Sequence, residues 1–319
     1  MDIQVIISQM AVLFILIAVG YIVGKIKMLT PDGVKTLSKI VLNISTPSMI
    51  LYSVLSDTGS ITGSNTAYFM FMILLLYILF FLIAIPAGRV LGRLRPDEQC
   101  VPGSEQSGSA NGGLYSFMIV FGNVGFMGFP VAHAIFGAES MFYVALVNVV
   151  FNILAYSVGI IMISEKGGKV NFKVLLNATF ISSLISFTIV FTGFRAPLII
   201  TDTVRIASGL NTPCAMLVIG ATLAQVPAKD VFTKWRLYPV AFLKMVVVPV
   251  ITWLVFKQIV TDELLLGVLV VLSGMPIAAA VAMIAVEYGG DERVASSGVF
   301  LTTLISSVTI PLVVYVLLM

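Results

Sequence analysis

The sequence predicts an all-α integral membrane protein with ten transmembrane helices, arranged as two inverted five-helix repeats whose fourth and ninth helices are broken. Three observations predict this fold: the composition, the placement of the basic residues, and a similarity between the two halves. Of the 319 residues, 59% are hydrophobic and only 10% are charged. Soluble domains carry about 25% charged residues, so the composition excludes a cytosolic enzyme, a disordered chain and a small disulfide-bonded domain. Helices follow because a backbone in lipid must satisfy its own hydrogen bonds.

Ten segments are candidates for membrane spans, since crossing the hydrocarbon core takes about 20 apolar residues. Six are uniformly apolar, two are interrupted by glycine and proline, and two are weak because they contain many small and polar residues. The uniform segments lie near 5–24, 67–88, 141–163, 172–194, 236–256 and 294–318, the interrupted ones at 114–137 and 263–287, and the weak ones at 36–56 and 200–224.

The basic residues alternate between the gaps that separate these segments. With the N-terminus placed outside, the inward gaps hold fourteen of the 18 lysines and arginines, the outward gaps hold three, and Lys244 lies inside a span. Cytoplasmic loops of membrane proteins carry such an excess of positive charge. We therefore expect ten spans in the cell (inner) membrane, with both termini non-cytoplasmic. The inward residues are Lys25, Lys27, Lys35, Lys39, Arg89, Arg93, Arg95, Lys166, Lys169, Lys173, Lys229, Lys234, Arg236 and Arg293, and the outward ones are Arg195, Arg205 and Lys257.

The chain is expected to divide into two repeats of five spans each. The first repeat covers residues 1–163 and the second, inverted repeat covers residues 164–319. Residues 95–113 read RPDEQCVPGSEQSGSANGG, and their glycine, serine and polar residues predict a flexible cytoplasmic loop. A natural loop and an artificial insertion both fit this composition.

The second half of the chain resembles the first at three pairs of spans. A unit of five spans is odd, so the second copy must be inverted in the membrane. Inverted repeats with interrupted spans at matching positions are typical of secondary transporters. The matching pairs are residues 42–47 (LNISTP) and 210–213 (LNTP), residues 129–132 (FPVA) and 275–278 (MPIA), and Pro86 and Pro249.

Pro130 and Pro276 are expected to break the fourth and ninth helices near the middle of the bilayer. Proline lacks an N–H and clashes with the carbonyl four residues back, and three glycines in residues 122–128 add backbone freedom before Pro130. We expect the helices to restart near residues 132–133 and 278–279. The free N–H groups and the partial positive charge at such restarts favour an anion. Two restarts that face one hydrated cavity predict a site for a carboxylate.

At these motifs the chain resembles the auxin efflux carrier family, the bacterial relatives of the plant PIN auxin transporters, within the superfamily of bile-acid, auxin and arsenite-type transporters. The resemblance implies that the fourth and ninth helices cross, that scaffold and transport bundles form from helices of both repeats, and that the transport bundle moves like an elevator. It also implies a secondary transporter, an efflux carrier or permease, for organic anions such as auxin-like carboxylates or malate-type dicarboxylates. The matching residues are 20–21 (GY), 24–25 (GK), 46–47 (TP), 121–123 (FGN) through 128–130 (GFP), 220–223 (GATL), and 275–276 (MP) through 287–289 (EYG).

The resemblance also implies a role for one side chain. In this family an asparagine at the break of the fourth span contacts the substrate carboxylate, and Asn123 holds that place here. The chain lacks the long cytoplasmic loop of the larger plant members. Its ninth-span break, residues 273–280 (SGMPIAAA), has no side-chain amide to mirror Asn123.

The expected binding site gathers residues of the two breaks and of the second and seventh spans. Other readings stay open: an interhelical hydrogen bond fits Asn123, simple kinks fit the prolines, and tight helix packing fits the small and hydroxyl residues. The expected substrate-binding residues are Asn123, Gly122, Gly125, Pro130, Pro276, Ala278, Thr46, Ser45, Asn43, Asn211 and Thr212, and the candidates for coupling or charge compensation are Lys244, His133 and Asp202.

Each of the ionisable candidates also has a structural explanation. Lys244 fits both a side chain that snorkels to the inner face and one that counters a charge in the membrane. For His133, a neutral hydrogen-bonded histidine of the interior or an interface is preferred over a proton-coupling group. For Asp202, an outer-surface ion pair with Arg205 is preferred. Asn148 and Asn152 share one face of the fifth span, and we expect them to bond between helices.

The sequence predicts no enzyme, no cofactor, no metal site and no nucleic-acid partner. It has one histidine and two cysteines, lacks HExxH and GxSxG motifs, and shows no basic stripe with interleaved aromatics. The expected partners are a small organic anion and the lipid bilayer, and a homodimer is compatible with the sequence. A sodium-coupled bile-acid-transporter-like symporter and a non-transporting membrane sensor with the same pocket remain alternatives. The sequence leaves open the substrate, the coupling ion, the direction and the oligomeric state.

Overall fold

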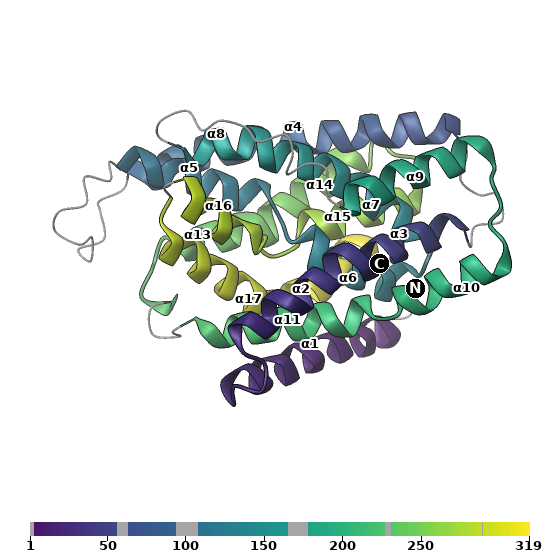
Figure 1. The fold of residues 1–319 in the computed structure, drawn as a ribbon. Helices are drawn as coiled ribbons and strands as arrows, with labels where there is room; N and C mark the ends of the chain where they lie inside the picture. The colour runs from purple at the N-terminus through teal and green to yellow at the C-terminus, as the bar shows by residue number, and fades with distance from the viewer. Residues whose placement is uncertain (1–2, 56–62, 94–107, 165–177, 227–230, 289) are drawn as a thin grey trace.

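The computed structural model describes residues 3–55, 63–93, 108–164, 178–226, 231–288 and 290–319, which form a bundle of helices that run along one common direction (Figure 1). Within these residues there is no strand, and one isolated antiparallel bridge joins Gly122 to Ile277. The prediction of an all-helical protein is therefore confirmed for the described part of the chain.

Four of the elements are single π turns, labelled η, each of which runs directly into the α-helix that follows it. The elements are α1 (Ile3–Lys25), α2 (Pro31–Ile40), η1 (Val41–Ser45), α3 (Thr46–Leu55), α4 (Gly63–Arg93), α5 (Gly108–Val120), η2 (Val124–Gly128), α6 (Phe129–Phe136), α7 (Ser140–Leu154), η3 (Ala155–Gly159), α8 (Ile160–Ile163), α9 (Ala178–Thr192), α10 (Leu198–Ser208), α11 (Asn211–Gln225), α13 (Leu237–Phe242), η5 (Leu243–Val247), α14 (Val248–Phe256), α15 (Glu263–Ser273), α16 (Ala280–Tyr288) and α17 (Glu292–Leu318).

Six helical stretches in the described residues are long and apolar enough to cross a membrane. They include five of the six uniformly apolar segments and one of the two weak ones. The sixth uniform segment, near 172–194, is a shorter apolar helix, Ala178–Thr192, in the described residues. These helices make the chain a multi-pass membrane protein. The six stretches are Ile7–Lys25, Thr66–Arg93, Ser140–Ile163, Leu198–Gln225, Leu237–Phe256 and Glu292–Leu318.

Helices α1 and α11 pack backbone against backbone through glycines. A Cβ atom on Gly220 would overlap the carbonyl oxygen of Ile17, and a Cβ atom on Gly20 would lie 2.6 Å from the carbonyl oxygen of Leu217. Lipid chains are as apolar as leucine, so helices in a bilayer associate through such close approach of small residues rather than through hydrophobic burial. The glycines of the 20–21 and 220–223 motifs therefore join the first helix to a helix of the second half.

Helices α4 and α5 make a second close contact. Part of the loop predicted from the sequence belongs to α5. The Ser116 hydroxyl donates to the carbonyl of Ala84 at 3.0 Å, and Cβ atoms on Gly88 or Gly113 would overlap backbone or side-chain atoms of the neighbouring helices. The flexible loop predicted over residues 95–113 is therefore wrong for residues 108–113, which begin α5. The glycines there serve close packing rather than flexibility, and residues 95–107 lie outside the described residues.

Three of the prolines in helical segments closely follow a π turn. In a π turn the hydrogen bonds reach five residues back, so the backbone widens locally and the helix continues past a residue that has no N–H to donate. The residue before each proline donates the last such bond. The three pairs are η1 with Pro47, η2 with Pro130, and η5 with Pro249, and the closing bonds run from Thr46 to Val41, from Phe129 to Val124, and from Val248 to Leu243.

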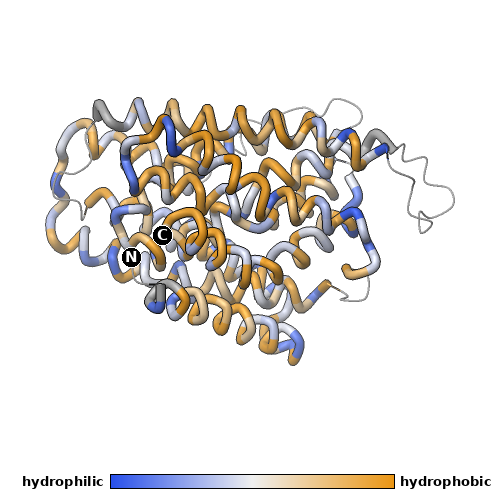
Figure 2. Tube along the Cα trace, turned by 180° about the vertical axis from the view of Figure 1, so that it is seen from behind, coloured by the Kyte–Doolittle hydropathy of each residue, from blue (hydrophilic) through white to orange (hydrophobic). Residues whose placement is uncertain are grey.

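The bundle has an apolar middle and polar ends, as a membrane protein requires. Figure 2 shows the hydrophobic colour along the helices and most strongly hydrophilic stretches near the two ends of the molecule. Asp262 and Asp291 cap the starts of α15 and α17, accepting hydrogen bonds from the N–H groups of Leu265 at 2.9 Å and Val294 at 3.0 Å.

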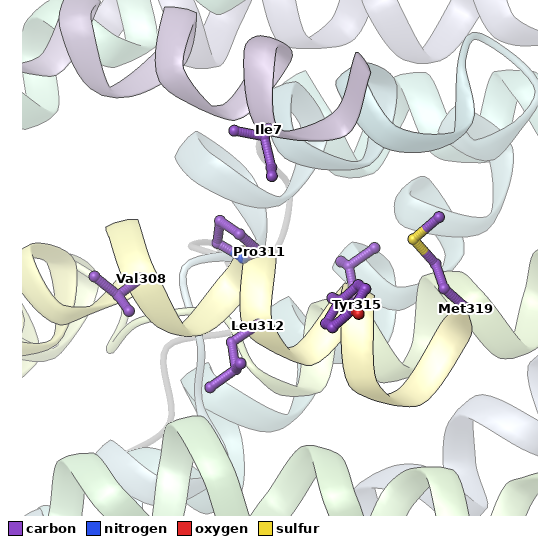
Figure 3. Close-up of a pocket in the computed structure, with 7 residues that line it drawn as sticks. Ile7, Val308, Pro311, Leu312, Tyr315 and Met319 are labelled. Carbon is purple, nitrogen blue, oxygen red and sulfur yellow. The ribbon is translucent and has the colours of Figure 1, made fainter. Parts of the chain in front are cut away.

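The two termini lie at the same end of the bundle. Ile7 near the start of the chain and Met319 at its end line one apolar groove of about 250 Å³ between α1 and α17. In Figure 3, Ile7 projects from α1 toward Pro311 of α17. An even number of membrane crossings gives this arrangement, whereas the side of the membrane on which the termini lie stays a prediction.

Candidate functional site

Two unwound segments from opposite halves of the chain lie side by side in the interior of the bundle. Residues 121–123 separate α5 from η2, and residues 274–279 separate α15 from α16. Gly122 and Ile277 form the antiparallel bridge. The N–H of Asn123 donates to the carbonyl oxygen of Pro276 at 2.7 Å, and the N–H of Ala278 donates to that of Phe121 at 3.1 Å. We call these two segments the crossover.

The break in the fourth span lies earlier than the sequence suggested. The expected restart near residues 132–133 is wrong, because the chain is helical from Val124 to Phe136 and the unwound residues are 121–123. The π turn η2 lets the helix pass Pro130, so the proline does not mark the break. In the ninth span Pro276 does lie in the unwound segment, and the helix resumes at Ala280, close to the expected position.

Asn123 begins the helix that follows the first break. Its backbone adopts φ −77° and ψ 66°, and its Oδ1 accepts a hydrogen bond from the N–H of Phe126 at 3.2 Å. The side chain therefore acts as an N-cap, at the end where the helix dipole places partial positive charge. Asn123 is only 4% exposed. Among the described residues no acceptor is recorded for its Nδ2 group.

A second amide lies beside the same helix start. Asn152 donates from Nδ2 to Oδ1 of Asn148 at 2.7 Å, within α7, whereas the sequence predicted bonds between helices. This bond holds Asn148, which is buried, so that its Nδ2 lies 3.6 Å from where a Cβ of Gly125 would be. Asn148 was not among the expected binding residues. Its i, i+4 spacing to Asn152 was the signal that could have identified it.

Lys244 lies in η5, and its side chain reaches the crossover. It is completely buried, and its Nζ donates to the carbonyl oxygen of Val120, at the end of α5, at 3.3 Å. The same nitrogen lies 5.2 Å from the ring centroid of Phe80 and 3.2 Å from where a Cβ of Gly122 would be. The alternative in which Lys244 snorkels to the surface is therefore wrong.

Thr302 supports the second unwound segment of the crossover, residues 274–279. The N–H of Ile277 donates to Oγ1 of Thr302 in α17 at 3.1 Å, and this hydroxyl donates in turn to the carbonyl of Gly298 at 2.7 Å. The side chains of Ile277 and Thr302 are both buried. Thr302 was missed in the sequence, where it lies in a uniformly apolar span without a distinguishing motif.

Two of the expected polar residues, Thr46 of the second span and Asn211 of the seventh, bond to one another. Oγ1 of Thr46 donates to Oδ1 of Asn211 at 3.1 Å, and Nδ2 of Asn211 contacts the sulfur of Met49 at 2.9 Å. Ser45 is buried and donates to the carbonyl of Val41 in its own helix. These groups join η1 and α3 to α11, which also packs against η2.

Four of the expected residues lie away from the crossover. Asn43 is exposed and donates to the carbonyl of Lys39 in its own helix, and Thr212 is half-buried on α11. His133 is exposed on α6, so it is not an interior histidine. Asp202 forms the predicted exposed ion pair with Arg205, at 3.3 Å between Oδ1 and Nε. The described structure thus brings together Asn123, Gly122, Gly125, Pro276, Ala278 and Lys244.

Several proteins with similar sequences bear the names of transporters. One relative is an uncharacterised transporter of Methanothermobacter thermautotrophicus, 24% identical over 93% of this chain and 94% of its own length. Another is an uncharacterised transporter of Methanocaldococcus jannaschii, 27% identical over 96% of this chain and 97% of its own length. A protein of Rhizobium meliloti named "Putative malonate transporter" is 25% identical over 64% of this chain and 67% of its own length.

The profile of one protein family matches nearly the whole chain. It is described as membrane transport protein, and it matches residues 5–173 and 167–314. The two matched segments meet near residue 170, and they include both unwound segments of the crossover. The chain therefore belongs to the membrane transport protein family, whose members are transporters of the auxin efflux carrier type that the sequence resembles.

Proposed function

We propose that this membrane transporter is a secondary carrier for small organic anions, and that it binds a substrate carboxylate at the crossover. The observation that supports this most is that three donors belong to one helix start or lie beside it. These donors are the Nδ2 groups of Asn123 and Asn148 and the N–H of Gly125, which belongs to the first turn of η2, where N–H groups have no partner within the helix.

A carboxylate suits this arrangement for electrostatic reasons. A helix N-terminus carries about half a positive charge and stabilises an anion by about 0.3–2 kcal/mol. Backbone N–H groups and two amides add hydrogen bonds without adding a formal charge. Binding of this kind is strong enough for recognition and weak enough for release, as a carrier requires.

The substrate class that we propose is a short dicarboxylate of malonate type. One relative bears a name that refers to malonate, and the crossover offers two helix starts, at Val124 and at Ala280, from the two halves of the chain. Two carboxylates on one short chain match two positive helix ends. The ninth-span break contributes backbone only, because residues 274–279 carry no amide side chain.

The proposed transport cycle is alternating access by two inverted five-helix repeats, one bundle moving against the other. The location of both termini at one end of the bundle supports an even number of crossings. The bridge between Gly122 and Ile277 supports a pairing of the fourth and ninth spans across the two halves. Broken helices that meet near the middle of the membrane are the usual substrate sites of such carriers.

Uptake of radiolabelled malonate into proteoliposomes tests this function. We expect uptake above that of empty liposomes, saturation with malonate concentration, and a loss of about tenfold or more in Asn123→Ala, on the scale of one lost buried hydrogen bond to a charged group. Ser157→Ala is the matched control, because Ser157 is half-buried and its hydroxyl donates to the carbonyl of Ile153 in its own helix. Binding of malonate without uptake would instead favour the membrane sensor, and absence of both would refute the proposal.

A further inference from the structure

Lys244 is a buried lysine in the middle of an apolar membrane-spanning helix. It is enclosed completely, although it lies within Leu237–Phe256, one of the six stretches that can cross the membrane. A charged side chain at such a depth is costly, and it is found where it serves a function. The contacts of Lys244 indicate what that function is.

The ammonium of Lys244 lies at the negative end of a broken helix. Its Nζ donates to the carbonyl of Val120, the last residue of α5, at 3.3 Å. The last carbonyls of a helix have no partner within it and carry about half a negative charge. The ring of Phe80 lies 5.2 Å from Nζ and offers its π face as a second contact.

No carboxylate of the described residues is recorded as a partner of this ammonium. The ion pair found in the described part of the chain joins Asp202 to Arg205, and both side chains are about half exposed. The electrostatic partner of Lys244 is therefore the end of α5. In carriers built from discontinuous helices, unwound carbonyls and half-helix C-terminal ends are the groups that coordinate a coupling cation.

We propose that Lys244 takes the place of a coupling cation at the C-terminal end of α5, so that transport by this chain needs no sodium. The proposal rests on the carrier function proposed above and decides one of its open questions, the sodium-coupled alternative. Lys244 touches backbone rather than substrate in this arrangement. It is a positioning residue, because Val120 leads within three residues to the N-cap Asn123.

The space around Gly122 supports this proposal. A Cβ on Gly122 would lie 3.2 Å from Nζ of Lys244 and also 3.2 Å from the carbonyl oxygen of Met275. The lysine head and a carbonyl of the second unwound segment thus both lie close against Gly122, and the lysine head also contacts the carbonyl of Val120. A sodium ion there would meet the ammonium at contact distance, where two like charges repel strongly in a medium of low dielectric.

Ion replacement and chemical rescue test the proposal on reconstituted protein. Malonate uptake by the wild type is expected to stay the same when sodium chloride is replaced by choline chloride. In Lys244→Ala, uptake should fall by about tenfold or more, since a broken helix end is left uncompensated. Addition of n-propylammonium, which matches the deleted part of the side chain, should restore uptake several-fold, whereas choline is too large to do so. Lys257→Ala, at the exposed end of the same span, is the matched control and should behave like the wild type.

Two further measurements keep the test independent of folding and of the carrier function. Lys244→Met keeps the apolar stem and removes the charge, so it decides the outcome if the alanine variant does not fold; it should fold and transport poorly. If the wild type moves no malonate, the carrier proposal fails by itself. The unfolding temperature then tests Lys244: that of Lys244→Ala should rise with n-propylammonium relative to choline, and that of the wild type should not respond to sodium. A sodium requirement in the wild type, full activity of folded Lys244→Met, or no rescue of folded Lys244→Ala would overturn the proposal.

Discussion

The N–H of Asn123 donates a hydrogen bond of 2.7 Å to the carbonyl oxygen of Pro276, and this bond joins the two unwound segments of the crossover. The same asparagine caps the next helix with its side chain. One residue therefore fixes where the fourth span unwinds, where it resumes and how it meets the ninth.

Asn123→Asp separates the structural role of this residue from its proposed binding role. Aspartate is as good an N-cap as asparagine, so the bond to the N–H of Phe126 is kept and the unfolding temperature should stay close to that of the wild type. The added negative charge repels a carboxylate, so the apparent KM for malonate should rise by at least about tenfold. An unchanged KM would remove Asn123 from the binding site.

Gly122→Ala and Gly125→Ala form a matched pair. A Cβ at Gly122 meets the lysine head and Met275 at 3.2 Å, which should destabilise the fold by about 1–3 kcal/mol through overpacking. A Cβ at Gly125 lies at ordinary contact distance from Nδ2 of Asn148, so this variant should fold normally but bind malonate more weakly. Unfolding in mixed SDS micelles and malonate binding measure the two effects. Equal stability of the two variants would contradict the close packing at Gly122.

Thr302→Val tests the support of the ninth-span segment. The substitution keeps the shape of the side chain and leaves the buried N–H of Ile277 without its acceptor, which costs about 1–3 kcal/mol. Thr309→Val, on the same helix and half-buried, is the control and should change the free energy of unfolding much less. Similar losses in both variants would show that Thr302 contributes only helix packing.

Thr46 and Asn211 should be coupled across the two halves of the chain. Their side chains are bonded at 3.1 Å, and such bonds in membranes contribute about 0.6 kcal/mol on average. A double-mutant cycle with Thr46→Val and Asn211→Leu measures this coupling from free energies of unfolding. Additive effects of the two substitutions would mean that the bond contributes nothing to stability.

The sequence alone was sufficient for the helical class of the fold and for the two interrupted spans that meet at the crossover. Composition and the spacing of apolar segments identified the helices, because bilayer thickness sets the length of a span. The prolines identified the two interrupted spans. Their exact breaks needed the structure, since η2 carries the helix past Pro130 and the unwound residues precede it by several positions.

The contacts of the site depended on tertiary packing that no local pattern reveals. Nothing near Lys244 in the sequence shows that its head reaches the end of α5, and nothing near Thr302 shows that it accepts from Ile277. The sequence likewise did not show that Asn43 and His133 are exposed. A single polar residue in an apolar span does not indicate which face of the helix is buried. Asp202 and Arg205 were predictable, since their partners are three residues apart on one helix.

The most direct test of the central claim is an experimental structure with bound malonate. We expect a carboxylate at the start of η2, within hydrogen-bond distance of the N–H of Gly125 and of the side-chain amides of Asn123 and Asn148. Malonate bound elsewhere, for example near the groove between α1 and α17, with these three groups unchanged from the unbound state, would contradict the account.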